Sequence, residues 1–221
     1  MSGYGQFCAV ARAQEVVGGR WTLLVVREML CGSRRFNDIR RGIPRISRTV
    51  LSERLQVLTE IGAVRHVGTE YELTEAGKEL AALVQASAVW AQRWLPRHAK
   101  TEDLDLEPVL IDMQRRVRDA ALPKDPLVLR VAIAKYKPRF LLLSAGQSAL
   151  CTHNPGFPEP ITLGGPLYAL VAWWRGDASF AQAQHIGLTL AGPKKLVRDF
   201  PGWFERYVFA DVAPAAKAAA A

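Results

Sequence analysis

The sequence predicts an α+β protein made of two domains. Its 221 residues, of which 49% are hydrophobic, suffice for two units of about 100 residues, each with a buried core. In the first hundred residues, helical apolar spacing is interrupted once by a short hairpin pattern. In the remainder, strand-like alternation and helical spacing are mixed. These observations predict a mainly helical domain followed by a mixed one.

The first domain opens with two predicted helices, which Gly18 and Gly19 separate. Paired glycines disfavour a continuous helix, because glycine loses the most conformational freedom on folding. The second helix, Trp21–Cys31, is apolar nearly all round, which is typical of a helix that packs on several sides. A connector and a short helix that buries Phe36 and Ile39 complete this part.

The next predicted helix begins after a turn that contains glycine and proline, with Ser47 as its N-cap. Leu51, Leu55 and Leu58 then recur at helical spacing, and Gly62 stands where a helix-ending residue belongs. Because the leucines form a stripe on one side, the positions between them point outward. The outward face is therefore open to a partner.

Two short strand-like runs follow, joined at Gly68 and Thr69, a pattern typical of a β-hairpin. Thr74 can start a long helix that runs to Trp94, and Pro96 stops it. The order is helix, helix, short helix, helix, hairpin and long helix. This order predicts a winged helix-turn-helix domain, in which the helix before the hairpin enters the DNA major groove.

Basic charge is concentrated in this first domain. The chain has a net charge of +8, of which residues 1–100 carry +6 and residues 101–221 carry +2. Solubility alone explains scattered charge better than a cluster, and a cluster is the electrostatic footprint of a polyanion. Between residues 34 and 66 three acidic residues stand against eight arginines, which are Arg34, Arg35, Arg40, Arg41, Arg45, Arg48, Arg54 and Arg65.

The predicted partner is double-stranded DNA. Arginine pairs with guanine edges, glutamine reads adenine, and hydroxyls suit either. The candidates for base edges are Arg48, Thr49, Ser52 and Gln56. Phosphates would be held at the helix N-terminus and by basic or polar side chains, namely Arg34, Arg35, Arg45, Ser47, Arg54, Arg65 and His66. Arg54 and Gln56 could instead be ordinary solvated residues, and Glu53 on the same face would repel phosphate.

Several motifs of the first domain, residues 1–98, occur together in one family. They are an early cysteine with "VARA", then "GGRWTLL", "RRFNDI", "LSERL" and "YELTEAGKEL", in this order across about residues 7–96. With them the domain closely resembles the HxlR-type winged-helix transcription regulators. The resemblance implies a DNA-binding homodimer that pairs through its terminal helices, here Cys8–Val17 and Thr74–Trp94. Trp90 and Trp94 are then candidates for the dimer interface, or alternatively for the core of one subunit.

Some members of that family sense oxidants or electrophiles with a cysteine near the N-terminus. Cys8 stands at this position, so the resemblance makes it a candidate redox sensor. Ala9 stands where the family has proline. A small buried cysteine without redox function is the alternative.

The second half begins with an acidic linker at residues 99–108 and a predicted helix. Residues 127–136 alternate, which predicts a strand with Leu129, Val131 and Ile133 on one face. A hairpin, a strand, two helices, another strand and a closing helix follow. This mixed order predicts an α+β domain.

The segments "ITLGGPLYALVAWWRGD" and "IGLTLAGPKKLVRDF" make the region from about 105 to 206 similar to the sterol-carrier-protein type 2 fold. The resemblance implies a domain at residues 109–208, a flexible tail at 209–221, and an apolar tunnel for a hydrophobic small molecule. The expected pocket residues are Phe140, Leu142, Leu170, Trp173, Trp174, Phe180, Leu188 and Phe204. Alternatively, such side chains fill a core of their own, and the domain is structural or extends the dimer.

Other classes of protein are disfavoured by the motifs that the sequence lacks. Cys8, Cys31 and Cys151 are odd in number and far apart, which argues against a disulfide framework and a structural zinc. No phosphate loop, HExxH motif or nucleophile elbow indicates an enzyme, and no metal or cofactor is expected. No apolar run approaches ~20 residues and the start does not resemble a signal peptide, so we expect a cytoplasmic protein without membrane contact.

Together these features predict a dimeric, sequence-specific transcription regulator, with repression the more common outcome for such a resemblance. A dimer would read a pseudo-palindromic operator with half-sites about one helical turn apart, or a multiple of that. A hydrophobic ligand in the second domain could control it. Two alternatives remain: a lipid carrier whose winged helix serves dimerisation or protein contacts, and an architectural DNA binder with little sequence preference.

Overall fold

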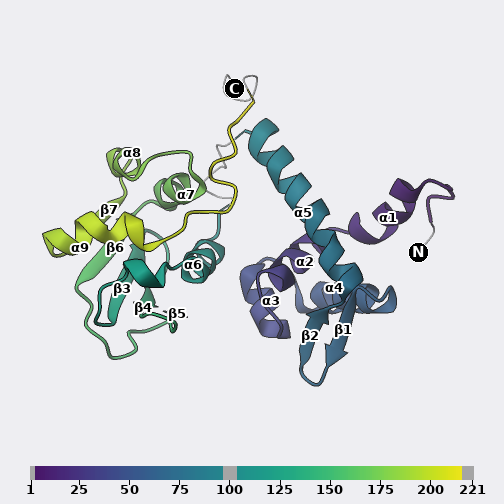
Figure 1. The fold of residues 1–221 in the computed structure, drawn as a ribbon, viewed down its shortest axis with the longest axis horizontal. Coiled ribbons are helices and arrows are strands. Elements are labelled where there is room, and N and C mark those ends of the chain that lie inside the picture. Colours follow the sequence, from purple (N-terminus) through teal and green to yellow (C-terminus); the bar gives the residue numbers. More distant parts are fainter. Residues whose placement is uncertain (1–2, 97–103, 216–221) are drawn as a thin grey trace. The chain divides into compact units, whose positions relative to one another are not determined.

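The computed structural model describes residues 3–96 and 104–215 of the chain (Figure 1). The chain divides into two compact units, Met1–Trp90 and Ala91–Ala221. Each unit combines helices with a sheet of its own, which confirms the predicted α+β class. Within the described residues, the helices are too short or too polar to cross a membrane.

The first unit has the element order predicted for a winged helix-turn-helix domain. Figure 1 shows its hairpin at the lower end of the unit, and α4 packs against the first hairpin strand. In chain order the elements are α1 Ala9–Val17, α2 Thr22–Leu30, α3 Phe36–Gly42, α4 Arg48–Glu60, β1 Val64–Val67, β2 Glu70–Leu73 and α5 Glu75–Trp94.

Local sequence explains both ends of α4. Ser47 is the N-cap, and its hydroxyl accepts a hydrogen bond from the Val50 amide at 3.1 Å, which satisfies one of the free amides at the helix start. Gly62, just past the helix end, has a φ of 74°, a left-handed conformation that favours glycine. The predicted cap and stop are confirmed.

The hairpin, called the wing below, is fastened to the helices on both sides. Its strands β1 and β2 are antiparallel, and the Tyr71 amide donates to the Arg34 carbonyl at 2.8 Å. Gly77 in α5 lies so close to β1 that a Cβ at this position would collide with the Ala63 carbonyl. The wing is thus held both to the connector before α3 and to the start of α5.

The leucine stripe of α4 faces the apolar core of the first unit, as predicted. Leu51, Leu55 and Leu58 are at most 1% exposed, and Ile39 of α3 is fully buried beside them. The remaining core residues come from α2, from the segment between α3 and α4, and from β1 with the residue before it, and are Val25, Val26, Met29, Ile43, Ile46, Ala63 and Val64. The opposite face of α4 is consequently turned to solvent.

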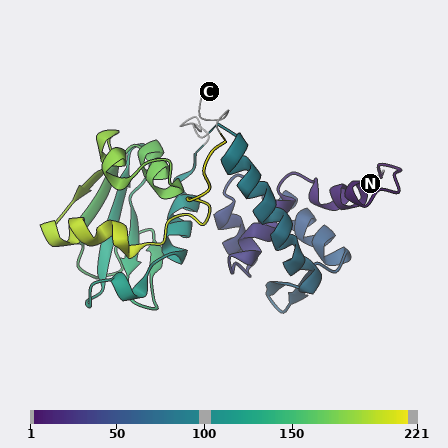
Figure 2. The same cartoon turned by 45° about the horizontal axis from the view of Figure 1, so that its top comes forward.

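The second unit is built on a five-stranded sheet with the order β5-β4-β3-β6-β7. β3 and β6 are parallel, and the other neighbours are antiparallel. Figure 2 shows the helices of this unit lying against the sheet. In chain order the elements are α6 Leu106–Arg115, η2 Asp119–Ala121, β3 Leu127–Ile133, β4 Arg139–Leu143, β5 Ala149–Cys151, β6 Ile161–Gly165, α7 Leu167–Arg175, α8 Phe180–His185, β7 Thr189–Ala191, α9 Lys194–Asp199 and η3 Phe200–Trp203.

Aromatic rings in contact with one another form much of the core of the second unit. The ring centroid of Trp173 lies between 5.2 and 6.4 Å from those of Trp174, Phe180, Phe200 and Phe204. Leu170 and Leu188 are buried in the same core. This packing corresponds to the filled core that the sequence left open as the alternative to a tunnel.

Two residues of the expected pocket lie on the other face of the sheet. Leu141 and Leu143 of β4 belong to the core, whereas Phe140 and Leu142 are only half-buried. Successive side chains of a strand point to opposite faces, so Phe140 and Leu142 do not share a pocket with Trp173. The expected pocket is wrong at these two positions.

The ends of the second unit differ from the expected boundaries. α6 begins at Leu106, which is buried, within the segment 99–108 that was expected to be a linker; residues 99–103 lie outside the described part. Residues 209–215 of the expected tail are described, and the Ala210 amide donates to the Tyr207 carbonyl at 2.8 Å. Residues 216–221 lie outside the described part.

Candidate nucleic-acid interface

The outward face of α4 carries all four predicted base-reading side chains. Arg48, Thr49, Ser52 and Gln56 are exposed, while the leucine stripe behind them is buried. The Gln56 amide nitrogen donates to the Glu60 carboxylate at 2.8 Å, so it would have to exchange this partner for a base edge. The face as a whole offers a cation, two hydroxyls and an amide in one row, which is the chemistry of direct base readout.

The wing and α4 enclose a shallow hollow beside this face. Its volume is about 300 Å³, and Ser52, Gln56 and His66 are among its lining residues. The His66 ring stacks on Tyr71 with 4.4 Å between ring centroids, and the two residues are cross-strand partners. Such pairs stabilise a hairpin, so His66 is held at the edge of the α4 face.

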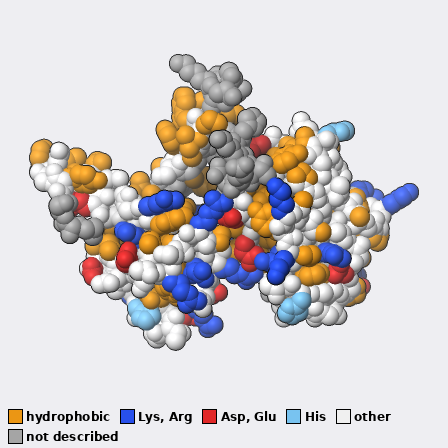
Figure 3. Space-filling model, turned by 180° about the vertical axis from the view of Figure 1, so that it is seen from behind, with side chains coloured by type: hydrophobic (Ala, Val, Ile, Leu, Met, Phe, Trp, Pro, Cys, Tyr) orange, Lys and Arg blue, Asp and Glu red, His pale blue; other side chains and the backbone are white. Residues whose placement is uncertain are grey.

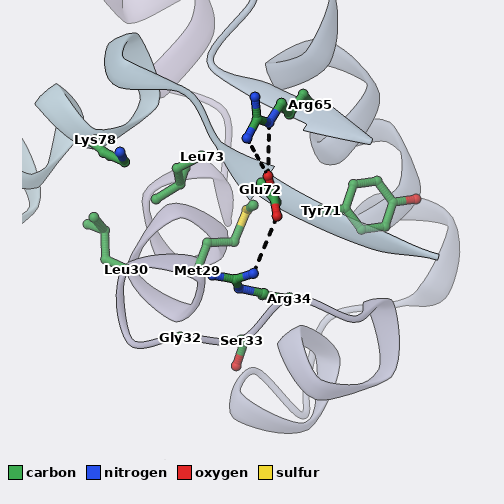
Figure 4. A pocket seen from close by; sticks show the side chains of 10 residues that line it. All are labelled: Met29, Leu30, Gly32, Ser33, Arg34, Arg65, Tyr71, Glu72, Leu73 and Lys78. Atoms are coloured by element: carbon green, nitrogen blue, oxygen red, sulfur yellow. Dashed lines mark hydrogen bonds and ion pairs between the residues drawn. The ribbon is translucent and has the colours of Figure 1, made fainter. Parts of the chain in front are cut away.

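Two wing carboxylates hold three of the arginines predicted to bind phosphate. Arg65 donates to one oxygen of Glu72 through Nε at 2.9 Å and through Nη2 at 2.6 Å, while Arg34 Nη1 lies 3.3 Å from the other oxygen (Figure 4). Arg35 Nε lies 3.2 Å from a carboxylate oxygen of Glu70. The three arginines belong to the connector before α3 and to β1, and the wing brings them together.

The arginines remain available to a second anion. The side chains of Arg34, Arg35 and Arg65 are 61%, 67% and 66% exposed, and ion pairs at such sites are weak, about 0–1 kcal/mol. Each guanidinium has five N–H donors, of which the carboxylates use one or two. Hydrogen bonds from Arg65 hold the pKa of Glu72 below its ordinary value of 4.5, so this carboxylate is charged near neutral pH.

Glu70 and Glu72 were missed as site residues. The signal was present, because a hairpin that turns at Gly68 and Thr69 places Arg65 directly opposite Glu72, and opposite charges in such pairs attract. The contacts of Arg34 and Arg35 with the wing could not be found in this way. They depend on the tertiary approach of the connector to β2.

Arg54 does not point outward with the other candidates. Its side chain is 24% exposed, and its guanidinium lies against the turn between α1 and α2, since a Cβ on Gly19 would stand 2.6 Å from Nη1. Its Nε atom is buried and has no hydrogen-bond partner. The structure thus holds Arg54 away from the exposed row of α4, and its phosphate contact stays a prediction.

The remaining phosphate candidates precede α4. Arg45 is exposed in the segment before the helix, and the Ser47 hydroxyl is engaged in the N-cap. Figure 3 shows Lys and Arg side chains gathered over the lower part of the first unit on the face turned to the viewer. A polyanion at the start of α4 would meet this charge together with the helix N-terminus.

Cys8 lies at the N-cap of α1 and is half-buried. The backbone amides of Ala11 and Val10 at the start of the helix hold the pKa of its thiol below its ordinary value of 9.0. A helix N-terminus favours a thiolate in this way.

In the described part of the chain, His, Cys, Asp and Glu side chains form no group of three or more that could hold a metal ion.

Comparison with known proteins identifies the family of the first unit. The family described as HxlR-like helix-turn-helix matches residues 16–99. The HTH-type transcriptional regulator YvaP of Bacillus subtilis is 37% identical over 91 residues, which cover 38% of this chain and 84% of YvaP. The chain belongs to the HxlR-like helix-turn-helix family. The match ends at residue 99, so most of the second unit lies outside it.

Other relatives are also transcriptional regulators and not enzymes. An HTH-type regulator of Mycobacterium tuberculosis is 43% identical over 96 residues, which cover 40% of this chain and 60% of that protein. The chain thus spans less than two thirds of the length of this relative. Among solved structures, quinone-bound YodB of B. subtilis is 37% identical, covering 38% of this chain and 97% of its own, with a TM-score of 0.36. The redox regulator HypR in its reduced form is 31% identical. The match covers 38% of this chain and 90% of the HypR chain, with a TM-score of 0.35.

Proposed function

We propose that this HxlR-like chain is a dimeric, sequence-specific DNA-binding transcription regulator that inserts α4 into the major groove. The observation that carries the proposal is the division of α4 into a buried leucine stripe and an exposed row of Arg48, Thr49, Ser52 and Gln56. A helix presented in this way can read base edges without disturbing the core. Arg34, Arg35, Arg45 and Arg65 contact the phosphates on either side.

Dimerisation is supported by apolar side chains in and next to α1 and along α5 that are exposed to solvent. α1 has no buried residue, and Phe7 and Val10 are 102% and 75% exposed. Trp90 and Trp94 of α5 are 57% and 52% exposed. Exposed apolar surface of this kind is typical of a protein interface. Pairing through α1 and α5 would present two copies of α4 to a pseudo-palindromic operator, at which repression is the proposed outcome.

Arg48→Ala tests the orientation of α4. We expect the variant to lose about 1–3 kcal/mol of affinity for the operator and to relax the preference at one base pair per half-site. The measurement is fluorescence anisotropy on the operator and on a set of single-base variants. Arg198→Ala removes another exposed arginine, in α9, and should behave as the wild type. Unchanged affinity and base preference in Arg48→Ala would contradict the proposed orientation.

For the second unit we propose a sterol-carrier-like domain that takes a hydrophobic small molecule and thereby controls DNA binding. The five-stranded sheet and the aromatic core around Trp173 support it. Because the rings contact one another, a ligand can enter only if they separate, which should change tryptophan fluorescence. Titration with palmitate, followed by tryptophan fluorescence, is the test. Fluorescence that stays constant up to the solubility limit of palmitate would contradict ligand binding and indicate a structural role for this domain.

Cys8 is proposed as a thiol sensor within the same regulator. Its place at the N-cap of α1 lowers the thiol pKa, and a larger thiolate fraction makes a cysteine more readily oxidised. α1 is also one of the helices proposed to pair in the dimer. Modification of Cys8 would therefore act on the dimer and, through it, on DNA binding.

A further inference from the structure

A cavity within the first unit lies beneath the wing. Its volume is about 470 Å³, which is within the range of small-molecule sites. The end of α2 forms one side of it, the connector at residues 32–34 another, and β2 a third (Figure 4). Arg65 of β1 and Lys78 of α5 complete the lining.

The lining of this cavity is amphipathic. Met29, Leu30 and Leu73 supply apolar surface, and Arg34, Arg65 and Lys78 supply three cations. Figure 4 shows Leu30, Leu73 and Lys78 on one side, Arg34 and Arg65 around Glu72 on the other, and Met29 reaching between the two groups. An occupant that matches both surfaces must carry an apolar body and a negative charge.

The charge of the lining is not balanced from within. Glu72 is the single carboxylate among the lining residues, against three cations. Lys78 also contacts Glu75 at 2.6 Å, but the Glu75 side chain is 87% exposed, where an ion pair contributes little. A second carboxylate in the cavity would therefore meet guanidinium and ammonium donors that Glu72 does not use.

We propose that this cavity binds a small organic carboxylate with a compact apolar body, such as an aromatic acid. The ring lies on Met29, Leu30 and Leu73, and the carboxylate accepts hydrogen bonds from N–H donors of Arg34 and Arg65 that Glu72 does not use. A DNA phosphate alone would use the cations and leave the apolar surface without a partner. The apolar wall is the reason to assign the site to a small molecule.

The site has a consequence that rests on the proposed DNA-binding function. Arg34 and Arg65 are also proposed phosphate contacts, so the bound acid competes with the DNA backbone for the same donors. Ligand binding then weakens DNA binding, and DNA weakens ligand binding by the same factor, because coupling between two equilibria is reciprocal.

Direct binding is tested first, on the full chain without DNA. 2-Naphthoate is titrated by isothermal calorimetry, with 2-naphthylmethanol as a neutral molecule of the same shape. We expect saturable binding of the acid and at least about tenfold weaker binding of the alcohol, since a charge-assisted hydrogen bond is lost. Binding that is absent up to roughly 10 mM, or equal for acid and alcohol, would overturn the proposal.

A pair of matched variants tests where the acid binds. Leu30 and Leu24 are both in α2 and are 36% and 38% exposed, but only Leu30 lines the cavity. We expect Leu30→Asp to weaken naphthoate binding at least about tenfold and Leu24→Asp to leave it unchanged. Equal affinities of the two variants would place the acid elsewhere and overturn the assignment.

The competition with DNA is measured separately. Saturating 2-naphthoate should reduce the DNA affinity of the wild type and leave that of Leu30→Asp unchanged. If naphthoate binds but no DNA does, the cavity assignment stands and the proposed function fails. If DNA binds with the same affinity at saturating naphthoate, the proposed competition is wrong while the DNA-binding function stands.

Discussion

Glu72 connects two parts of the first unit through side chains alone. Its two oxygens contact Arg34 of the connector and Arg65 of β1, so one carboxylate positions two arginines proposed to bind DNA. The same carboxylate competes with phosphate for them. Glu72 therefore lowers the affinity for DNA while it fixes the positions of the two arginines.

Removing this charge should strengthen DNA binding. We expect Glu72→Gln to bind DNA of any sequence about two- to fivefold more tightly at low salt, because a negative charge near the phosphates disappears and both arginines are released. Anisotropy titrations at several salt concentrations measure this, with Glu79→Gln, which exchanges an acid of α5, as the control. Weaker binding of Glu72→Gln would show that positioning outweighs repulsion.

Acid should remove the contribution of the same residue to stability. The folded-state pKa of Glu72 is lowered below 4.5, so its ion pairs stabilise the fold above that pH, and this contribution is lost as the pH falls through the folded-state pKa. The difference in unfolding free energy between wild type and Glu72→Gln should accordingly shrink below about pH 4.5. Urea unfolding at a series of pH values measures it, and a difference that stays constant down to pH 2 would contradict the ion-pair geometry.

Cys8 provides a second test at the level of a single residue. Because its thiol pKa is lowered from 9.0 by the amides of Ala11 and Val10, alkylation of Cys8 by iodoacetamide should reach half its maximal rate below pH 9. Peptide mass spectrometry measures the alkylation of Cys8 separately from that of the other cysteines. Cys8→Ser is the control without a reactive thiol at this position. A midpoint at or above pH 9 would remove the support for a thiol sensor.

At the scale of elements, the junction between the wing and α5 depends on one glycine. A Cβ at position 77 would collide with the Ala63 carbonyl. Alanine in place of glycine normally favours a helix, but here we expect Gly77→Ala to destabilise the first unit by about 1–3 kcal/mol. Thermal unfolding measures it, and Gly202→Ala, where no atom lies within 4 Å of the added Cβ, is the control. A stabilised Gly77→Ala variant would contradict the close approach of α5 to β1.

The sequence was sufficient for elements whose signals are local. Ser47, the leucine stripe and Gly62 define α4 within a segment of sixteen residues, 47–62, and the turn at Gly68 defines the wing. What failed depended on contacts between distant segments. Arg54 is a predicted phosphate contact, but its guanidinium packs against the turn at Gly19, away from the exposed row of α4.

The alternation of side chains along β4 separates two residues of the expected pocket from the core. Leu141 and Leu143 share a face with the buried residues of β3, which places Phe140 and Leu142 on the other side. The aromatic core around Trp173 was recognised as apolar, but sequence alone could not decide whether the rings line a tunnel or pack together. Whether the rings line a tunnel or pack together depends on the spacing between α7, α8 and the segment of α9 and η3.

For the whole molecule, the proposed dimer makes a direct prediction. The double variant Phe7→Asp/Val10→Asp should be a monomer in analytical ultracentrifugation and should lose most of its operator affinity, because charges replace apolar side chains that are fully or largely exposed in one subunit. Val208→Asp alters a 60% exposed side chain of the second unit and should stay dimeric. A double variant that remains a dimer would exclude α1 from the interface.

The central claim is that α4 reads DNA sequence. The most direct measurement is fluorescence anisotropy of the full chain on the DNA upstream of its own gene, at several salt concentrations, with unrelated DNA as competitor. The account predicts binding that survives a roughly thousandfold excess of competitor and weakens steeply with salt. Equal, weak binding to both DNAs would contradict it and leave only the general attraction of the arginine cluster for a polyanion.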